Sequence, residues 1–179
     1  MLDLAQNAIS ARANTVTINI DENLQKNFMS VSIADDGCGM SPDFVKNVMD
    51  PFVTTRTTRK VGMGISFFKM AAEMTGGEMS IISEEGIGTT VIATFNTDHI
   101  DFVPLGDIMG TVVTLVMCNP DMNFEYKHSI DNREMLFSTE KIRLMLGGEV
   151  SLAEPEILVW IKEYLIEQYN LLTEERKHI

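Results

Sequence analysis

Several residues of this chain have the types and spacing that a binding site for a flat, charged ligand would use. Asp35, Gly37 and Gly39 directly follow a predicted strand, and Gly62 and Gly64 precede a predicted helix. An aspartate at a strand end can accept a hydrogen bond from an amino group, and flanking glycines let a ring approach the backbone. The N–H groups at a helix start suit phosphate. Each motif alone is also compatible with an ordinary tight turn.

Polar and basic residues elsewhere in the first half could complete such a site. Asn7, in a predicted helix, offers a hard oxygen ligand for Mg²⁺ that also holds triphosphate oxygens. Arg56, Arg59 and Lys60 supply positive charge just before the second glycine pair. The alternatives are a surface asparagine and a solvated loop. Because these groups and the turn at 88–90 occur in one order, each with a distinct task around a nucleotide, we predict a nucleotide-binding site.

Apolar periodicity predicts the elements that position these motifs. Alternation of apolar and polar residues indicates strands, and apolar stripes or capping residues indicate helices. In the first half these elements are a helix over 2–13, strands over 15–20 and 28–34, a short helix over 41–49, a helix over 65–74, and strands over 79–83 and 89–96.

A second unit is expected to begin near residue 99. The predicted division is a nucleotide-binding domain over 1–98 and a strand-and-helix extension of unknown role over 99–179. The expected elements of the extension are a strand over 111–118, a hairpin over 123–137, a helix after Ser138 that ends at Gly147 and Gly148, and a last helix after Pro155.

The last helix has an apolar stripe, formed by Leu158, Ile161, Leu165, Tyr169 and Leu172. This stripe favours packing of the helix on its own domain. The alternative is a partner-binding or homodimer-forming helix, because the flank with Trp160 could leave an aromatic surface exposed.

The composition is that of an ordinary globular protein with an acidic surface. Of the 179 residues, 45% are apolar and 22% are charged, and 26 acidic against 14 basic residues give a net charge of −12. Since phosphate neutralisation needs clustered Lys and Arg, no nucleic-acid binding is expected. The apolar runs are too short to cross a bilayer, and the start lacks the basic region of a signal peptide. Two cysteines make neither a disulfide framework nor a zinc site, so a cytoplasmic protein without membrane contact is expected.

The order of the motifs resembles that of the GHKL ATPase superfamily, which includes gyrase, the heat-shock chaperone, histidine kinases and mismatch-repair proteins. LDLAQNAISA resembles its N box, IADDGCGM its G1 box, VGMGIS its G2 box and EEGIGTT its G3 turn. DPFVTTR and the stretch that begins GMGISFF are most similar to the histidine-kinase catalytic domain. The resemblance covers residues 2–96.

The resemblance implies an α/β fold of two layers, with helices on one face of a mixed, mostly antiparallel sheet and a C-terminal hairpin and helix added to it. ATP would lie between the helices. Asn7 would bind Mg²⁺, and Asp35 would bind the adenine amino group. The other cofactor-binding candidates are Gly37, Gly39, Met40 and Thr89 around the base, and Arg59, Lys60, Gly62, Met63 and Gly64 around the phosphates, with 50–61 as a lid.

Asp3 stands four positions before Asn7, where ATP-hydrolysing relatives carry a glutamate that activates water. Its carboxylate is the catalytic candidate, as a general base. The alternative is an acid that the helix dipole favours at an N-terminus. The family has further residues before this helix, so a trimmed domain with an open pocket edge is expected.

The histidines do not resemble a phosphoacceptor. His99, His128 and His178 lie outside any long amphipathic helix of that kind, and each is expected at the surface. We therefore expect an ATPase or protein kinase module, either a phosphotransferase or an ATP-dependent regulatory switch, that acts on a separate protein. The alternatives are an ATP-driven clamp of the MutL or gyrase type and a nucleotide-sensing scaffold without catalysis.

Overall fold

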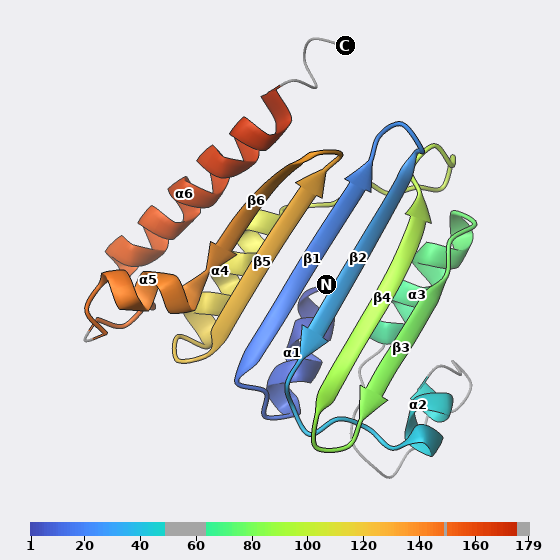
Figure 1. Ribbon diagram of the computed structural model, residues 1–179, viewed down its shortest axis with the longest axis horizontal. Helices are drawn as coiled ribbons and strands as arrows, with labels where there is room; N and C mark the ends of the chain where they lie inside the picture. The colour runs from blue at the N-terminus through green and yellow to red at the C-terminus, as the bar shows by residue number, and fades with distance from the viewer. Residues whose placement is uncertain (49–63, 149, 175–179) are drawn as a thin grey trace.

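A six-stranded mixed sheet forms the centre of the molecule, which a computed structural model describes over residues 1–48, 64–148 and 150–174 (Figure 1). The strand order is β3-β4-β2-β1-β5-β6. Neighbouring strands are antiparallel except β1 and β5, which are parallel. The mostly antiparallel sheet predicted from the sequence is confirmed. The strands are β1 (Thr15–Asn23), β2 (Phe28–Asp35), β3 (Met79–Glu84), β4 (Gly88–Asn96), β5 (Asn123–Ile130) and β6 (Arg133–Ser138).

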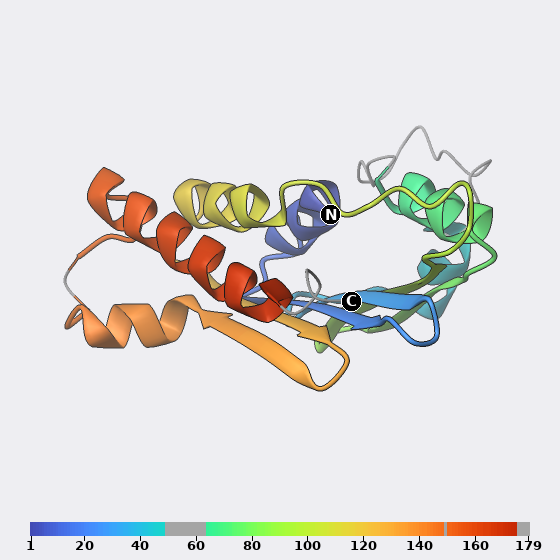
Figure 2. The same ribbon diagram turned by 90° about the horizontal axis from the view of Figure 1, so that it is seen from above.

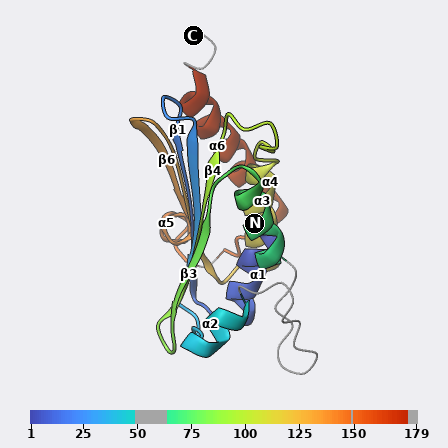
Figure 3. The ribbon, with the colours of Figure 1, turned by 90° about the vertical axis from the view of Figure 1, so that its right-hand side faces the viewer.

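Helices cover one face of this sheet. Figures 2 and 3 show α1 (Leu2–Ser10), α3 (Gly64–Met74), α4 (Ile108–Cys118) and α6 (Pro155–Thr173) on the same side of the strands. The short helices α2 (Pro42–Val48) and α5 (Thr139–Met145) lie at the two ends of the molecule. This is the two-layer arrangement that the sequence predicts.

The alternating pattern of the central strands explains which face the helices cover. Val16, Ile18 and Ile20 of β1 are buried, and Ile18 pairs with the buried Ile33 of β2. The intervening residues of β1 are only half-buried. One face of the pair is therefore apolar and packs on the helical layer, as expected for strands with period-two alternation.

The predicted strand over 111–118 is wrong, because this segment belongs to helix α4. Its run of Val, Thr and Leu suits a buried strand, but Asp107 caps a helix by accepting a hydrogen bond from the Gly110 N–H at 2.7 Å. Val112, Leu115 and Val116 are buried at helical spacing. The cap and this spacing override the β-propensity of the run.

The predicted hairpin over 123–137 is confirmed and extends the central sheet. β5 pairs with β1 along its whole length, from Thr15 opposite Asn123 to Glu22 opposite Ile130. Ser138 then caps α5 by accepting a hydrogen bond from the Lys141 N–H at 3.4 Å. Residues from both sides of the predicted boundary near 98 therefore contribute to one sheet.

His128 is buried, so its predicted surface position is wrong. It lies on the inward side of β5 and is 1% exposed. Its Nδ1 lies 2.8 Å from the Tyr126 hydroxyl, and its Nε2 lies 2.8 Å from Oε1 of Glu22. Its ring also contacts Tyr169 of α6, with centroids 5.5 Å apart. This cluster ties β1, β5 and α6 together, and burial raises the pKa of Tyr126 far above its ordinary value.

Candidate functional site

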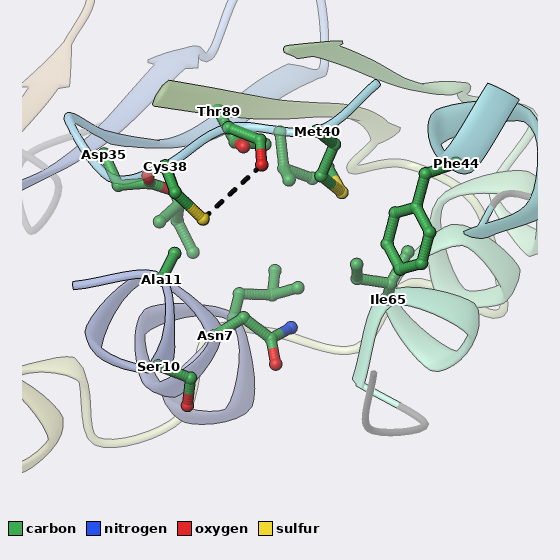
Figure 4. Close-up of a pocket in the computed structure, with 13 residues that line it drawn as sticks. Asn7, Ser10, Ala11, Asp35, Cys38, Met40, Phe44, Ile65 and Thr89 are labelled. Atoms are coloured by element: carbon green, nitrogen blue, oxygen red, sulfur yellow. Dashed lines mark hydrogen bonds between the residues drawn. The ribbon is translucent and has the colours of Figure 1, made fainter. Parts of the chain in front are cut away.

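A cavity of about 130 Å³ lies between α1, α2, α3 and the ends of β2 and β4. Figure 4 shows Asn7 and Ala11 of α1 on one side of it, and Asp35, Cys38 and Thr89 on the other. Phe44 and Ile65 close one end. The lining residues are Leu4, Asn7, Ser10, Ala11, Ile33, Asp35, Cys38, Gly39, Met40, Phe44, Ile65, Thr89 and Val91.

The cavity brings together five of the residues that the sequence proposes for the site: Asn7, Asp35, Gly39, Met40 and Thr89. Gly37 is buried directly beside it. Arg59, Lys60, Gly62 and Met63, together with the predicted lid over 50–61, lie outside the described residues. Gly64 and Asp3 lie next to one another outside the lining.

Asp35 is the acidic group of the cavity, placed at the last position of β2 opposite Thr89 of β4. Its Oδ1 accepts a hydrogen bond from the Gly37 N–H at 2.9 Å. Burial raises the pKa of the Asp35 carboxyl, the N–H groups of Gly37 and Thr89 oppose this shift, and the charge of Asp36 adds to it. A half-buried acceptor of this kind suits an amino group of a flat heterocycle.

Two glycines allow the loop after β2 and the β3–β4 turn to come into contact. Gly39 has a φ of +62°, and an added Cβ would overlap the Glu84 carbonyl. Gly88 has a φ of +142°, and an added Cβ would overlap the Asp35 carbonyl. Larger residues at either position would push the turn away from the cavity. Gly39 therefore has a structural reason to be glycine that is independent of any ligand.

Backbone hydrogen bonds fix the loop on two sides. The Cys38 N–H donates to the Ala11 carbonyl at the end of α1, and the Cys38 carbonyl accepts from the Gly86 N–H, both at 2.9 Å. The Met40 N–H donates to Ser83 Oγ at 2.8 Å, and the same oxygen lies 2.8 Å from the Thr89 hydroxyl. The loop is thus held between α1 and the β3–β4 turn.

Asn7 has an unusual environment for a helical amide. Its Nδ2 atom is buried and has no hydrogen-bond partner among the residues that the structure describes. A buried amide without a partner costs free energy, and a bound polar group would remove that cost. Because the amide can turn over, its carbonyl oxygen can face a ligand or a cation instead. The residue therefore fits the Mg²⁺ or phosphate role that the resemblance implies.

Asp3, the catalytic candidate, is exposed and does not line the cavity. It lies against the first residue of α3, and an added Cβ on Gly64 would stand 3.2 Å from its Oδ2. The carboxylate is therefore beside the helix start where phosphates are expected. This position is compatible with a general base and equally with an acid attracted to a helix N-terminus.

Sequence reasoning missed the apolar lining and part of the polar frame. Leu4, Ile33 and Val91 were identifiable from the sequence only as core positions, because their inward pattern is that of any helix or strand. Ser83 gave no local signal, since its contacts with Met40 and Thr89 arise from the pairing of β3 with β4. Phe44 was not a candidate, because it stands four positions after the G1 box in a short helix and reaches the cavity only through the packing of α2.

Comparison with known proteins identifies the first half of the chain. Residues 1–99 match the family of histidine kinase-, DNA gyrase B- and HSP90-like ATPases. The chain belongs to this family. The resemblance read from the four boxes is confirmed, and this part of the chain is a histidine-kinase-like ATP-binding domain.

Individual relatives are sensor kinases. An uncharacterized sensor-like histidine kinase of Rhizobium meliloti is 32% identical over 103 residues, which are 55% of this chain and 20% of that protein. The sensor histidine kinase WalK of Bacillus subtilis is 33% identical over 90 residues, or 48% of this chain and 15% of that protein. The chain thus spans a fifth or less of the length of these two relatives.

One similar solved structure is the catalytic domain of histidine kinase ThkA. It is 25% identical, with a TM-score of 0.40, and the match covers 53% of this chain and 62% of that chain.

Among the described helices of this chain, none combines the length and the apolar character that crossing a bilayer requires.

Proposed function

We propose that this chain is a Mg²⁺–ATP-dependent module that transfers phosphate to, or switches, a separate protein. The observation that carries the proposal is the placement of Asp35 and Asn7 on one cavity with an apolar lining. A purine ring needs an apolar slot and a directed acceptor, and a triphosphate needs a cation. Both requirements have a candidate residue at this site.

The base end would be formed by Asp35, Thr89 and Met40. The Asp35 carboxylate would accept a hydrogen bond from the adenine amino group, and the Met40 side chain would lie against the ring. The Thr89 hydroxyl, oriented by Ser83 at 2.8 Å, would face the same end. Guanine presents an oxygen where adenine presents its amino group, so an ionised Asp35 favours adenine.

The phosphate end would lie between Asn7 and the start of α3. Mg²⁺, when bound, would neutralise triphosphate charge and polarise the γ-phosphate. The side-chain carbonyl oxygen of Asn7 (Oδ1) would be the protein ligand to the cation. Gly64 would present the helix start to phosphate oxygens. Arg59, Lys60, Gly62 and Met63 remain candidates for this end and stay predictions.

The two histidines that the structure describes, His99 and His128, support a nucleophile on another protein. His128 is buried with both ring nitrogens in hydrogen-bonding contacts, so it is closed to phosphoryl transfer. The Nδ1 of His99 accepts a hydrogen bond from the Asp101 N–H at 3.2 Å, and His99 is not among the residues that line the cavity. In the proposed reaction the γ-phosphoryl group moves from ATP to a side chain of the partner, and ADP leaves.

One assay separates transfer from hydrolysis. The assay follows phosphate release from γ-labelled ATP in the presence of Mg²⁺. If Asp3 activates water, Asp3→Asn should lower the rate of phosphate release by about 10²–10⁴. If a partner side chain is the nucleophile, Asp3→Asn should leave the slow background release unchanged. Failure of the wild-type chain to bind a non-hydrolysable ATP analogue in calorimetry would overturn the proposal.

The remaining expectations about assembly and location stay predictions. A homodimer through the C-terminal helix, a cytoplasmic location and the division of the chain at residue 98 belong to this group. A mass measurement by sedimentation with and without Mg²⁺–ATP would test the clamp alternative, which requires an ATP-dependent dimer.

A further inference from the structure

The outer face of α6 carries features that packing within this chain does not explain. On its inner side Ile161, Leu165 and Leu172 are buried against the rest of the fold. Figure 2 shows α6 along the border of the helical layer, so its opposite side faces away from the sheet. The described part of the chain leaves that side exposed.

A row of glutamates runs along this outer face. Glu156, Glu163, Glu167 and Glu174 are all exposed and follow one another at intervals of seven, four and seven positions. These intervals place four carboxylates on one side of a helix. Lys162, a quarter turn away, is the single basic residue of α6. We call this row of four side chains the acidic ridge.

Apolar side chains border the acidic ridge. Trp160 is 48% exposed and Leu171 is 54% exposed on one flank, and Val159 and Ile166 are exposed on the other. The Trp160 ring stacks on Tyr164, with centroids 5.5 Å apart and planes 14° apart. Because this stacking already orders the indole, little conformational entropy would be lost if a partner covered it.

We propose that the outer face of α6 docks a basic amphipathic helix of another protein. The apolar face of such a helix would cover Trp160 and Leu171. Its lysines or arginines would pair with Glu163 and Glu167. Charge favours another protein over the homodimer alternative, because face-to-face pairing of two α6 helices would bring the two acidic ridges together. A partner with complementary charge meets no such repulsion.

Trp160 makes the test direct, since it is the single tryptophan of the chain. The probe is a synthetic helix of leucine and lysine with leucines at i, i+3 and i+4, titrated into the full chain in low salt. We expect a saturable change in Trp160 fluorescence that weakens as salt is raised. A scrambled peptide of the same composition keeps the charge but lacks the apolar face, and it should bind at least about tenfold more weakly.

Matched variants locate the contact. Glu163→Gln with Glu167→Gln should weaken binding about threefold to tenfold. Asp98→Asn with Asp121→Asn removes the same charge from exposed loops and should leave binding unchanged. Leu171→Ser, at an exposed site that the fold does not need, should weaken binding by about tenfold.

Three outcomes would overturn the proposal. One is the absence of a fluorescence change. Another is equal binding of the two peptides or of the two charge variants. The third is a dimer of the chain alone that Leu171→Ser abolishes in sedimentation, which would assign the face to a second copy. Because α6 lies outside the ATP cavity, ATP-analogue binding by Leu171→Ser reports separately on the proposed function.

Discussion

Gly64 of α3 lies against Asp3 of α1 so closely that a Cβ at position 64 would stand 2.5 Å from the Asp3 Cβ. Real Cβ atoms do not approach this closely, so α1 and α3 would have to separate to admit any side chain. Helix packing therefore explains glycine at the second position of the G2 pair independently of the proposed phosphate binding.

Gly64→Ala should lower the free energy of unfolding by about 1–3 kcal/mol, because the added methyl group overpacks this contact. Asp3→Gly removes the atom that the methyl group meets. The loss of unfolding free energy in the double variant, measured by urea unfolding, should therefore be smaller than the sum of the losses in the two single variants. Gly106→Ala is the control, since an added Cβ there meets nothing within 4 Å. Additive losses would show that the two residues are not in contact.

Asp35→Ala should weaken the binding of a non-hydrolysable ATP analogue by about tenfold to a hundredfold, because a charge-assisted hydrogen bond to the adenine amino group is lost. Isothermal calorimetry measures the change. Asp43→Ala, at an exposed carboxylate of α2, is the matched control and should bind like the wild type. Equal affinities for all three proteins would contradict the assignment of Asp35 to the base.

The raised pKa of Asp35 predicts how stability depends on pH. A carboxyl whose pKa in the folded state lies above its ordinary value of 3.8 contributes stability that is full below that value and lost as pH rises through the folded-state pKa. Asp35→Asn has no charge to bury, so its stability relative to the wild type should increase over this interval. Urea unfolding of both proteins across acidic pH measures the difference. A constant difference would place Asp35 in an environment like water.

The same titration should control binding of the base. Adenosine, which lacks phosphates that titrate nearby, should bind the wild type more tightly as the Asp35 carboxylate forms. Asp35→Asn should lack this gain, and the ratio of the two affinities reports on Asp35 because protonation of the adenine ring in acid affects both proteins alike.

Asn7→Leu should separate the two roles of this residue. Unfolding should be unchanged or require slightly more denaturant, because the buried amide nitrogen has no partner to lose among the described residues. The dependence of ATP-analogue affinity on Mg²⁺ should disappear, since leucine offers no oxygen ligand. Calorimetry with and without Mg²⁺ measures this. A large loss of stability, or unchanged Mg²⁺ dependence, would make Asn7 a structural residue.

The pattern of apolar and polar residues predicted the first half of the fold, because apolar and polar residues alternate regularly in its strands and its glycines lie in turns. It failed at 111–118, where a valine-rich run has the composition of a strand but the Asp107 cap begins a helix. It also placed His128 at the surface, although Phe124, Tyr126, His128 and Ile130 share the inward side of β5. That error followed from judging the histidine by its type rather than by its position in the alternation.

The sequence indicated some residues of the candidate cavity and not others, because only some of them stand in a local motif. Asp35 and Asn7 carry their chemistry in the side chain and stand in recognisable motifs. Ser83 and Phe44 gain their positions from strand pairing and from the packing of α2, which no local pattern contains.

The parallel pairing of β1 with β5 has a consequence for the order in which the chain can fold during synthesis. Thr15 meets Asn123, so β1 keeps one unpaired edge until more than a hundred further residues have left the ribosome. An open edge of this kind, with alternating Val16, Ile18 and Ile20, is a template for aggregation. A nascent chain that stalls before residue 123 would therefore leave this edge exposed, and the long sequence separation of the β1–β5 pairing favours slow, late closure of the sheet.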